Sequence, residues 1–329
     1  MEADKLKMRT WSMLGQRATY GTVLSELAQK YDNALVMTAD FARSSGLKRF
    51  AEEHPDRIIN VGIAEQNMIG IASGLASEGY NVFASSFAAF VASRCYEQVR
   101  LHAGYMHHNI KIAGLASGIG VDYQGNTHYG LDDICTMRNV PGLTIVAPAD
   151  CYEVANAVEA MMDFEGPVYL RLCGESNNPM VYKEPYEFKI GKAVPLMEGD
   201  DVAIFATGTM VNYSLKAAKA LAEEGIKCSM VNIHTIKPID DEAVKQYAEN
   251  SKLVVTVEEG FVEGGLYAAV MESLAKTSSK AFKSLALGIN GFLHAKAYKL
   301  MLAECGLDAE GIASSIKNKL NQRRENINV

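Results

Sequence analysis

Short apolar runs alternate with longer amphipathic segments along most of the chain, and this alternation indicates the class of fold. In the first half, the apolar runs that predict β-strands are residues 34–38, 57–61, 81–85, 110–115, 143–148 and 168–172. Helical spacing of apolar positions predicts helices at residues 18–29, 63–78, 87–103 and 150–163. Strands that are apolar throughout and separated by helices are typical of a parallel sheet covered on both faces. Because such crossovers are right-handed, the pattern predicts a doubly wound α/β fold.

The alternation breaks at residues 173–201, which are rich in Pro, Gly, Asn and charge, and then restarts. The second half contains strand-like runs at 201–207, 228–233, 252–257 and 284–288 and helical patterns at 210–224, 240–250 and 265–276. A chain of 329 residues also exceeds the usual size of a single core. We therefore predict a larger α/β domain at 10–180, a linker at 181–195 and a smaller α/β domain at 196–320.

Composition excludes several classes of function. The formal net charge of −7 argues against a protein that binds nucleic acid. No apolar run approaches the roughly 18 residues that span a bilayer, and the start, MEADKLKMRT, lacks the apolar core of a signal peptide. The six cysteines have irregular gaps and form no C-x-x-C, so neither a zinc ribbon nor a redox pair is indicated. These features predict a cytoplasmic protein with free thiols and no membrane contact.

Nucleotide-binding motifs are absent or incomplete. The sequence contains no G-x-x-x-x-G-K-[ST], which removes the P-loop class. The glycine-rich stretch GLASGIGVDYQG (114–125) follows a strand, but Tyr123 stands at the third glycine position of G-x-G-x-x-G. A Rossmann dinucleotide site is therefore not predicted.

Glu65 is the first candidate for chemistry. It lies in NVGIAEQN (60–67), just after a strand-like run, among small and apolar residues and in the first turn of a predicted helix. A carboxylate there can simply interact with the positive end of the helix dipole, which contributes about 0.3–1 kcal/mol. The same helix is unusually bare, with Gly70, Ser73 and Gly74 on its surface, which would permit close approach of another backbone, as at a subunit interface.

Two further segments place candidate residues at the ends of neighbouring strands. Phe87 and Phe90 stand three apart at a strand-to-helix junction, and His128 lies in a loop before a helix. Phenylalanines at this spacing are also common in cores. However, ligands of doubly wound sheets bind at the carboxyl ends of the strands. Together with Glu65, these residues predict a site at that edge.

The motifs resemble one family in combination. GIAEQN (62–67), SSFAAF (85–90), GNTH (125–128), LDDICTMR (131–138) and PGLTIVAPAD (141–150) resemble the pyrimidine-binding domain of the transketolase family. That family also includes deoxyxylulose-phosphate synthase and the β subunits of 2-oxo acid dehydrogenases. VNIHTIKPID (231–240) and VTVEEGFVEGGL (255–266) resemble the family's C-terminal domain. The larger domain would then have the pyrimidine-type fold that binds thiamine diphosphate.

The chain lacks the G-D-G motif with which the family's diphosphate-binding domain holds Mg²⁺. The resemblance therefore implies the C-terminal subunit of a split transketolase, which transfers a two-carbon ketol unit from a ketose to an aldose. An N-terminal subunit carrying G-D-G…Asn would share the thiamine diphosphate and hold the Mg²⁺ in an α2β2 assembly, so no metal site is assigned to this chain. The alternatives are a 2-oxo acid dehydrogenase β subunit, deoxyxylulose-phosphate synthase chemistry, and a catalytically silent binding module.

The resemblance also implies roles for individual residues. Glu65 would hydrogen-bond N1′ of the aminopyrimidine from a dry site, and His128 would bind the donor's C1 hydroxyl or the oxygen that develops charge. The other residues line the coenzyme or the sugar phosphate. Those implied at the coenzyme are Phe87, Phe90, Asp40 and Phe41, and those implied at the sugar phosphate are Arg17, Ser44 and Arg171. For Arg17 and Arg171 a surface ion pair is the alternative.

Two departures from the family pattern concern the substrate. Typical members have a basic residue where this chain has Ala116, and an Asp where it has Gln124, near the sugar hydroxyls. Ala116 in place of a basic residue would weaken binding of an anion. Gln124 in place of Asp would alter recognition of the sugar hydroxyls close to the reacting carbon. We therefore hypothesise a modified sugar or a differently placed anion, which turnover of xylulose 5-phosphate at least equal to that of every modified ketose would contradict.

Overall fold

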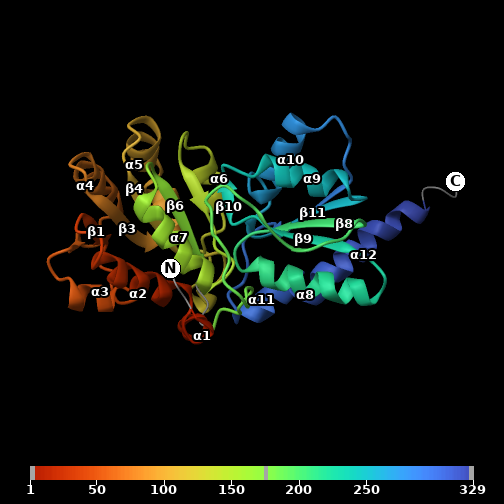
Figure 1. Cartoon of the computed structure of the whole chain (residues 1–329), viewed down its shortest axis with the longest axis horizontal. Coiled ribbons are helices and arrows are strands. Elements are labelled where there is room, and N and C mark those ends of the chain that lie inside the picture. The colour runs from red at the N-terminus through yellow and green to blue at the C-terminus, as the bar shows by residue number, and fades with distance from the viewer. Residues whose placement is uncertain (1–3, 174–176, 326–329) are drawn as a thin grey trace.

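The computed structural model describes residues 4–173 and 177–325, which form two α/β units, each built on its own sheet (Figure 1). The first sheet has the strand order β10-β5-β6-β4-β3-β1-β2 and the second the order β12-β11-β8-β9-β7. All pairings are parallel except those of β10 with β5 and of β7 with β9. The predicted fold class, two mainly parallel α/β sheets, is confirmed.

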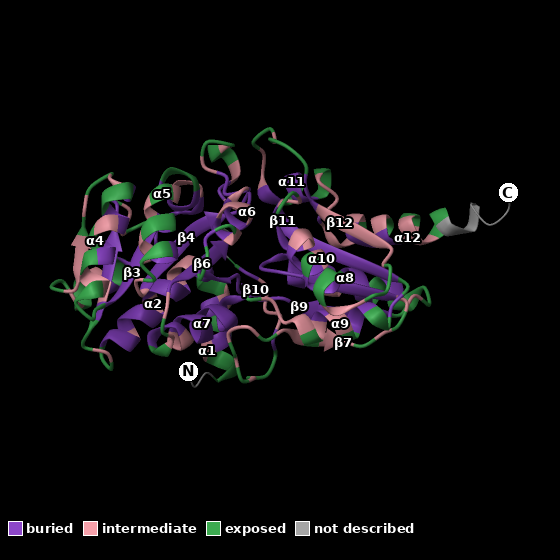
Figure 2. Cartoon of the chain, turned by 90° about the horizontal axis from the view of Figure 1, so that it is seen from above, coloured by how far each residue is buried: buried purple, intermediate pink, exposed green. Residues whose placement is uncertain are grey.

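The strands of the first sheet coincide with the apolar runs of the first half. They are β1 (Ala34–Thr38), β2 (Ile58–Asn60), β3 (Asn81–Phe87), β4 (Ile110–Ser117), β5 (Thr144–Val146), β6 (Val168–Cys173) and, from the second half, β10 (Thr235–Lys237). Neighbouring side chains along a strand pack on opposite faces: Val36 belongs to the core on one side of the sheet and Met37 to the core on the other. Residues of β3, β4, β5 and β6 are buried throughout, which explains the absence of polar alternation in the sequence (Figure 2).

Helices cover both faces of this sheet. One face packs on α1 (Lys5–Leu14), α2 (Gln16–Ala28) and α7 (Cys151–Asp163). The other face packs on α4 (Glu65–Ser77), a bent helical segment that follows β3, and α6 (Asp133–Arg138). The short α3 (Lys48–Glu53) packs on α2. The outward side of α4 is exposed in Figure 2, and Ile71 on this helix is 36% exposed.

The second sheet is smaller and is covered in the same way. Its strands are β7 (Val194–Met197), β8 (Val202–Ala206), β9 (Cys228–Asn232), β11 (Leu253–Phe261) and β12 (Ser284–Ile289). One face packs on α8 (Met210–Glu223), α11 (Tyr298–Glu304) and α12 (Ala309–Glu325), and the other on α9 (Asp241–Glu249) and α10 (Leu266–Thr277). Within the described ranges, no helix is long and apolar enough to cross a membrane.

Two local features differ in detail from the sequence pattern. The chain is helical over most of the predicted 87–103, but Phe87 ends β3 and the helical part is divided into π-helix η1 (Phe90–Arg94), α5 (Tyr96–Val99) and π-helix η2 (Arg100–Tyr105). Ser85, Ser86 and Phe87 continue the strand because all three are buried against its neighbours. In addition, β10 lies within the predicted second domain but pairs antiparallel with β5, so the two units share a sheet edge.

Candidate active site

Aromatic rings from three segments meet at the carboxyl ends of β1, β3 and β4. The ring centroid of Phe41 lies 4.2 Å from that of Phe87, and that of Phe90 lies 5.5 Å from Phe87. The imidazole of His128 lies 5.4 Å from Phe87 and 5.5 Å from Phe90, edge-on to both. These four residues, which we call the ring cluster, form an apolar surface with a single polar ring. The structure thus brings together the rings that the sequence placed on separate segments.

Glu65 lies beside this cluster and is only 4% exposed. Nη1 of Arg94 lies 2.8 Å from each of its two carboxylate oxygens and donates to both. The same guanidinium stands 4.2 Å from the ring centroid of Phe90, so Arg94 bridges the carboxylate and the ring cluster. Glu65 is also the first residue of α4, as the helix-dipole alternative requires. Its burial beside an aromatic surface goes beyond that alternative, because a dipole contact alone needs no shielding from water.

The loop before Glu65 is fixed by Asn60 at the end of β2. Its Oδ1 accepts hydrogen bonds from the main-chain N–H groups of Asp40 (2.9 Å) and Gly62 (3.0 Å), and its Nδ2 donates to Asp40 Oδ1 at 3.2 Å. Asp40 has a φ of 56°, in the left-handed region, and its side chain is exposed at the rim. Asn60 therefore holds the Asp40–Phe41 turn in register with the segment that carries Glu65.

His128 is half-buried and its orientation is set locally. Its main-chain N–H donates to the Gly125 carbonyl at 2.9 Å, and Nδ1 lies 2.9 Å from the Thr127 hydroxyl. This pairing leaves Nε2 without a hydrogen-bond partner among the described residues. The imidazole can therefore offer Nε2 to a ligand in front of the ring cluster.

Residues 12–178 match the family model "Transketolase, pyrimidine binding domain", and residues 191–312 match "Transketolase, C-terminal domain". The chain belongs to the transketolase family. Over 262 residues it is 43% identical to "6-deoxy-6-sulfo-D-fructose transketolase subunit SqwH" of Clostridium sp. (strain MSTE9), with 79% of this chain and 80% of the relative covered. The resemblance drawn from the motifs is confirmed.

Two further comparisons agree. The chain is 35% identical over 305 residues to an apulose-4-phosphate transketolase subunit of Phocaeicola vulgatus, with 92% of this chain and 97% of the relative covered. A solved structure described as "Split gene transketolase, inactive beta4 tetramer" superposes with a TM-score of 0.84 at 35% identity, covering 94% of this chain and 98% of that chain. These relatives are subunits of split transketolases, so a 2-oxo acid dehydrogenase β subunit is not favoured.

The geometry fits half of a thiamine diphosphate site. A shielded carboxylate next to stacked aromatic side chains suits a flat, nitrogen-containing ring such as an aminopyrimidine. Among the residues that the structure describes, no group of three or more His, Cys, Asp or Glu side chains is placed to hold a metal ion. The donor set therefore fits the pyrimidine end of the coenzyme.

Arg171, a predicted sugar-phosphate contact, lies elsewhere. Its side chain is 1% exposed; Nε donates to Asp133 Oδ2 at 2.8 Å and Nη2 to the Glu259 carbonyl at 2.7 Å. Burial lowers the pKa of Arg171, but the charges of Asp133, Cys173 and Glu259 and the hydrogen bond to Asp133 together outweigh it, so the pKa is raised overall. The surface ion pair considered as its alternative is wrong, because the pair is fully buried. In this structure Arg171 links β6 to β11 across the two units.

The remaining predicted substrate contacts gather away from the rings. Arg17 Nη1 donates to the Ser44 carbonyl at 3.2 Å, and the side chains of Ser44 and Gln124 are exposed. Arg17 and Gln124 line one cavity of about 840 Å³ between the two units. Ala116 is fully buried, so its position presents no group to this cavity.

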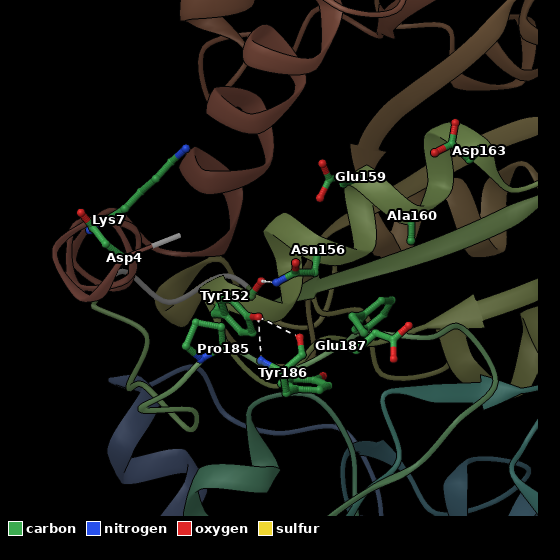
Figure 3. Close-up of a pocket in the computed structure, with 11 residues that line it drawn as sticks. Asp4, Lys7, Tyr152, Asn156, Glu159, Ala160, Asp163, Pro185, Tyr186 and Glu187 are labelled. Carbon is green, nitrogen blue, oxygen red and sulfur yellow. Dashed lines mark hydrogen bonds between the residues drawn. The ribbon is translucent and has the colours of Figure 1, made fainter. Parts of the chain in front are cut away.

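A second cavity, of about 890 Å³, lies between α1, α7 and residues 185–188 (Figure 3). Tyr152 and Tyr186 stand at its base, where the Tyr152 hydroxyl donates to the Tyr186 carbonyl at 2.9 Å. None of the ring cluster lines this cavity, and neither does Glu65. Size alone therefore does not identify the active site, and the convergence of a carboxylate, rings and imidazole is the better guide.

Arg94 was missed in the sequence. The only signal in the sequence was that Arg94 follows Phe90 by four residues. The π-helical turn that brings Arg94 over the Phe90 ring cannot be predicted from an apolar pattern.

We expect Arg94→Met to lower the free energy of unfolding by about 1–3 kcal/mol, because a buried carboxylate loses its donor. Arg100→Met, at an exposed pair with Glu97, is the control and should change it by less than about 1 kcal/mol. Equal denaturant midpoint shifts for the two variants would contradict this role.

Proposed function

We propose that the chain is the pyrimidine-binding subunit of a two-subunit, thiamine-diphosphate-dependent transketolase. The observation that carries the proposal is the buried Glu65 carboxylate beside the ring cluster, on a chain of this family. In this role the chain transfers a two-carbon ketol unit only together with an N-terminal subunit, which supplies the diphosphate and Mg²⁺ contacts. We also retain the proposed domain limits of 10–180 and 196–320.

Thiamine diphosphate supplies a thiazolium carbon that, once deprotonated, adds to the carbonyl of a ketose. The task of Glu65 is to hold a proton-sharing hydrogen bond to N1′ of the aminopyrimidine. A carboxylate performs this task best where water does not compete for its oxygens, and its 4% exposure meets that condition. Arg94 donates to both oxygens, and each oxygen keeps a lone pair that can accept a further hydrogen bond from the pyrimidine ring.

The ring cluster and His128 complete the role of this chain. Phe90 offers a face for stacking, and Phe87 and Phe41 support it from behind and exclude water. His128 has its Nδ1 beside the Thr127 hydroxyl, so its Nε2 can donate to the ketose hydroxyl or to an oxygen that gains negative charge. Asp40 lies at the rim and would contact the coenzyme's edge.

The names of relatives support a modified or unusual ketose as donor. One relative is named for a sulfonated fructose and another for apulose 4-phosphate. The related solved structure is described as an inactive tetramer of one subunit type. We infer that the present chain, too, is inactive alone and forms an α2β2 assembly with its partner.

The test is co-expression with an N-terminal transketolase subunit that carries G-D-G…Asn. We expect ketol transfer that depends on thiamine diphosphate and Mg²⁺ from the assembled enzyme and none from this chain alone. The assay should compare xylulose 5-phosphate with sulfonated and branched ketoses, and we expect at least one modified ketose to be the better donor. Activity of the isolated chain, or tight binding of the coenzyme to it, would contradict the shared site.

A further inference from the structure

The segment that carries His128 is residues 118–132, between the end of β4 and the start of α6, and we call it the His128 loop. It contains a single 3-10 turn, η3 (Asp122–Gln124). Main-chain N–H groups of the loop, among them those of Gln124 and His128, donate to carbonyls of the same loop. A loop of this kind takes its position from the scaffold on which it packs.

The apolar side chains of the His128 loop enter the core of the second unit. Four of them are buried in the cluster that also contains residues of β8, β11 and α11, namely Ile119, Val121, Tyr129 and Leu131. Among the described residues, the clusters on the two faces of the first sheet include none of these four. The loop therefore belongs to the first unit by sequence but packs with the second, and burial of this apolar surface holds the two together.

Asn126 joins the loop to the second unit by two hydrogen bonds. Its Nδ2 donates to the Leu293 carbonyl at 2.9 Å, and the Leu293 main-chain N–H donates to Asn126 Oδ1 at 3.1 Å. The side-chain amide thus pairs with both main-chain groups of one residue. Beside it, a Cβ built on Gly125 would lie 3.8 Å from the Cβ of Ala295, which is ordinary van der Waals contact.

The parts of the loop before and after Asn126 have polar contacts to the second unit as well. The Ile119 main-chain N–H donates to Glu259 Oε1 on β11 at 2.8 Å. Asp122 Oδ1 accepts from the Tyr298 main-chain N–H at 2.8 Å, at the start of α11. The Tyr129 hydroxyl, one residue after His128, lies 3.2 Å from the sulfur of Met301 on the same helix. His128 therefore stands between two residues, Asn126 and Tyr129, that contact the second unit.

The contacts of the imidazole itself do not fix its position independently of the loop. Its polar neighbour at Nδ1 is the hydroxyl of Thr127, which belongs to the same loop. The rings of Phe87 and Phe90 meet the imidazole edge-on, but contacts between apolar ring surfaces are less directional than hydrogen bonds. The place of His128 in front of these rings therefore depends on how the loop's main chain is held.

From this arrangement we infer that the second unit positions His128 for the reaction, and that Asn126 is the positioning residue through which residues 293–295 act. The inference rests on the proposed function, since it concerns the part that His128 plays in ketol transfer. The ring cluster and Glu65 all belong to the first unit, so this assigns the second unit a role in catalysis without direct contact to the coenzyme. Asn126 acts through the main chain of the loop.

The first test measures hydrogen exchange in the full chain alone. Asn126→Ala removes both bonds to Leu293 without a change of charge. Because Asn126 is exposed and water competes for its amide, we expect a moderate effect: exchange about 10-fold faster in residues 118–130 and 290–301, with β1 and α4 unchanged. Unchanged exchange of residues 118–130 would overturn the inference.

Asn33→Ala is the matched control for this measurement. The Asn33 side chain is also exposed, and its Nδ2 donates to the Gly79 carbonyl at 3.2 Å, at the amino ends of the strands. Its replacement removes the same type of bond on the edge of the sheet opposite the His128 loop. We expect exchange of residues 118–130 in this variant to equal that of wild type, and faster exchange there would show that the loop responds to any such loss.

The second test is a double-mutant cycle on the assembled enzyme, with D-xylulose 5-phosphate as donor. We expect Asn126→Ala to lower kcat by about 10-fold, because a displaced imidazole is poorly oriented towards the reacting oxygen. In a His128→Ala background the same change should alter kcat by less than about twofold, since Asn126 would have nothing left to position. The concentration of thiamine diphosphate that gives half-maximal activity should stay within about twofold of wild type in Asn126→Ala, because Glu65 and the phenylalanines are untouched.

The outcomes separate this inference from the proposed function. Equal loss of kcat in both backgrounds, or an unchanged kcat in Asn126→Ala, would contradict the positioning role. Absence of thiamine-dependent turnover in the wild-type assembly would count against the proposed function, and the exchange measurement would then decide by itself whether the second unit holds the His128 loop.

Discussion

Replacing Glu65 with Gln should reduce ketol transfer by the assembled enzyme by about 10²–10⁴-fold. Glutamine is nearly isosteric and keeps one hydrogen-bonding oxygen, but it cannot exchange a proton with the aminopyrimidine. The carboxylate is 4% exposed, so water is poorly placed to substitute for it. Steady-state rates at saturating coenzyme, with coenzyme affinity measured in parallel, would show a loss in kcat with a much smaller change in binding.

Glu78→Gln provides the matched control for this variant. Glu78 caps the other end of α4 and is exposed, so its replacement removes the same charge from the same helix. We expect activity within about twofold of wild type for this control. If Glu65→Gln retained more than a tenth of wild-type kcat, Glu65 would not be the proton-sharing group.

Replacing Arg171 with Met should lower the free energy of unfolding by about 3–5 kcal/mol, the usual cost of leaving a buried charge without its partner. Asp133 is fully buried, and its Oδ2 accepts from Arg171 at 2.8 Å and from the Tyr169 hydroxyl at 2.9 Å. Arg171 also donates to the Glu259 carbonyl on β11, so the variant removes a link between the two units. Denaturant unfolding monitored by circular dichroism measures the effect.

The control is Arg49→Met, which breaks an exposed pair with Glu53 on α3. Pairs of this kind contribute about 0–1 kcal/mol, so its midpoint should hardly move. A change of less than about 1 kcal/mol for Arg171→Met would show that Asp133 does not depend on this partner. That result would also support a role for Arg171 in ligand binding.

The fold was largely predictable because apolar runs and helical periodicity report burial directly. The six strand-like runs of the first half each contain a strand of the first sheet. Two short strands were missed for physical reasons. Strand β10 has only three residues and is followed by Pro238, and β7 has partly exposed positions, so neither produces a distinct apolar pattern. Their antiparallel pairing at sheet edges is set by tertiary contacts.

The site was predictable in part. Glu65, Phe87, Phe90 and His128 could be placed together because each stands at or after the end of a strand, and parallel strands present their carboxyl ends at one edge. Charge alone could not place Arg171, because the sequence does not show which carboxylate, Asp133, shares its buried space. The Arg94 contact depends on a π-helical turn.

The most direct test of the central claim is a structure of the two-subunit complex with thiamine diphosphate bound. We predict that a Glu65 carboxylate oxygen lies within hydrogen-bond distance of N1′ of the aminopyrimidine, with Phe90 against the ring and the diphosphate held by the partner subunit. A structure with the pyrimidine bound elsewhere, and Glu65 still paired through both oxygens to Arg94, would contradict the account.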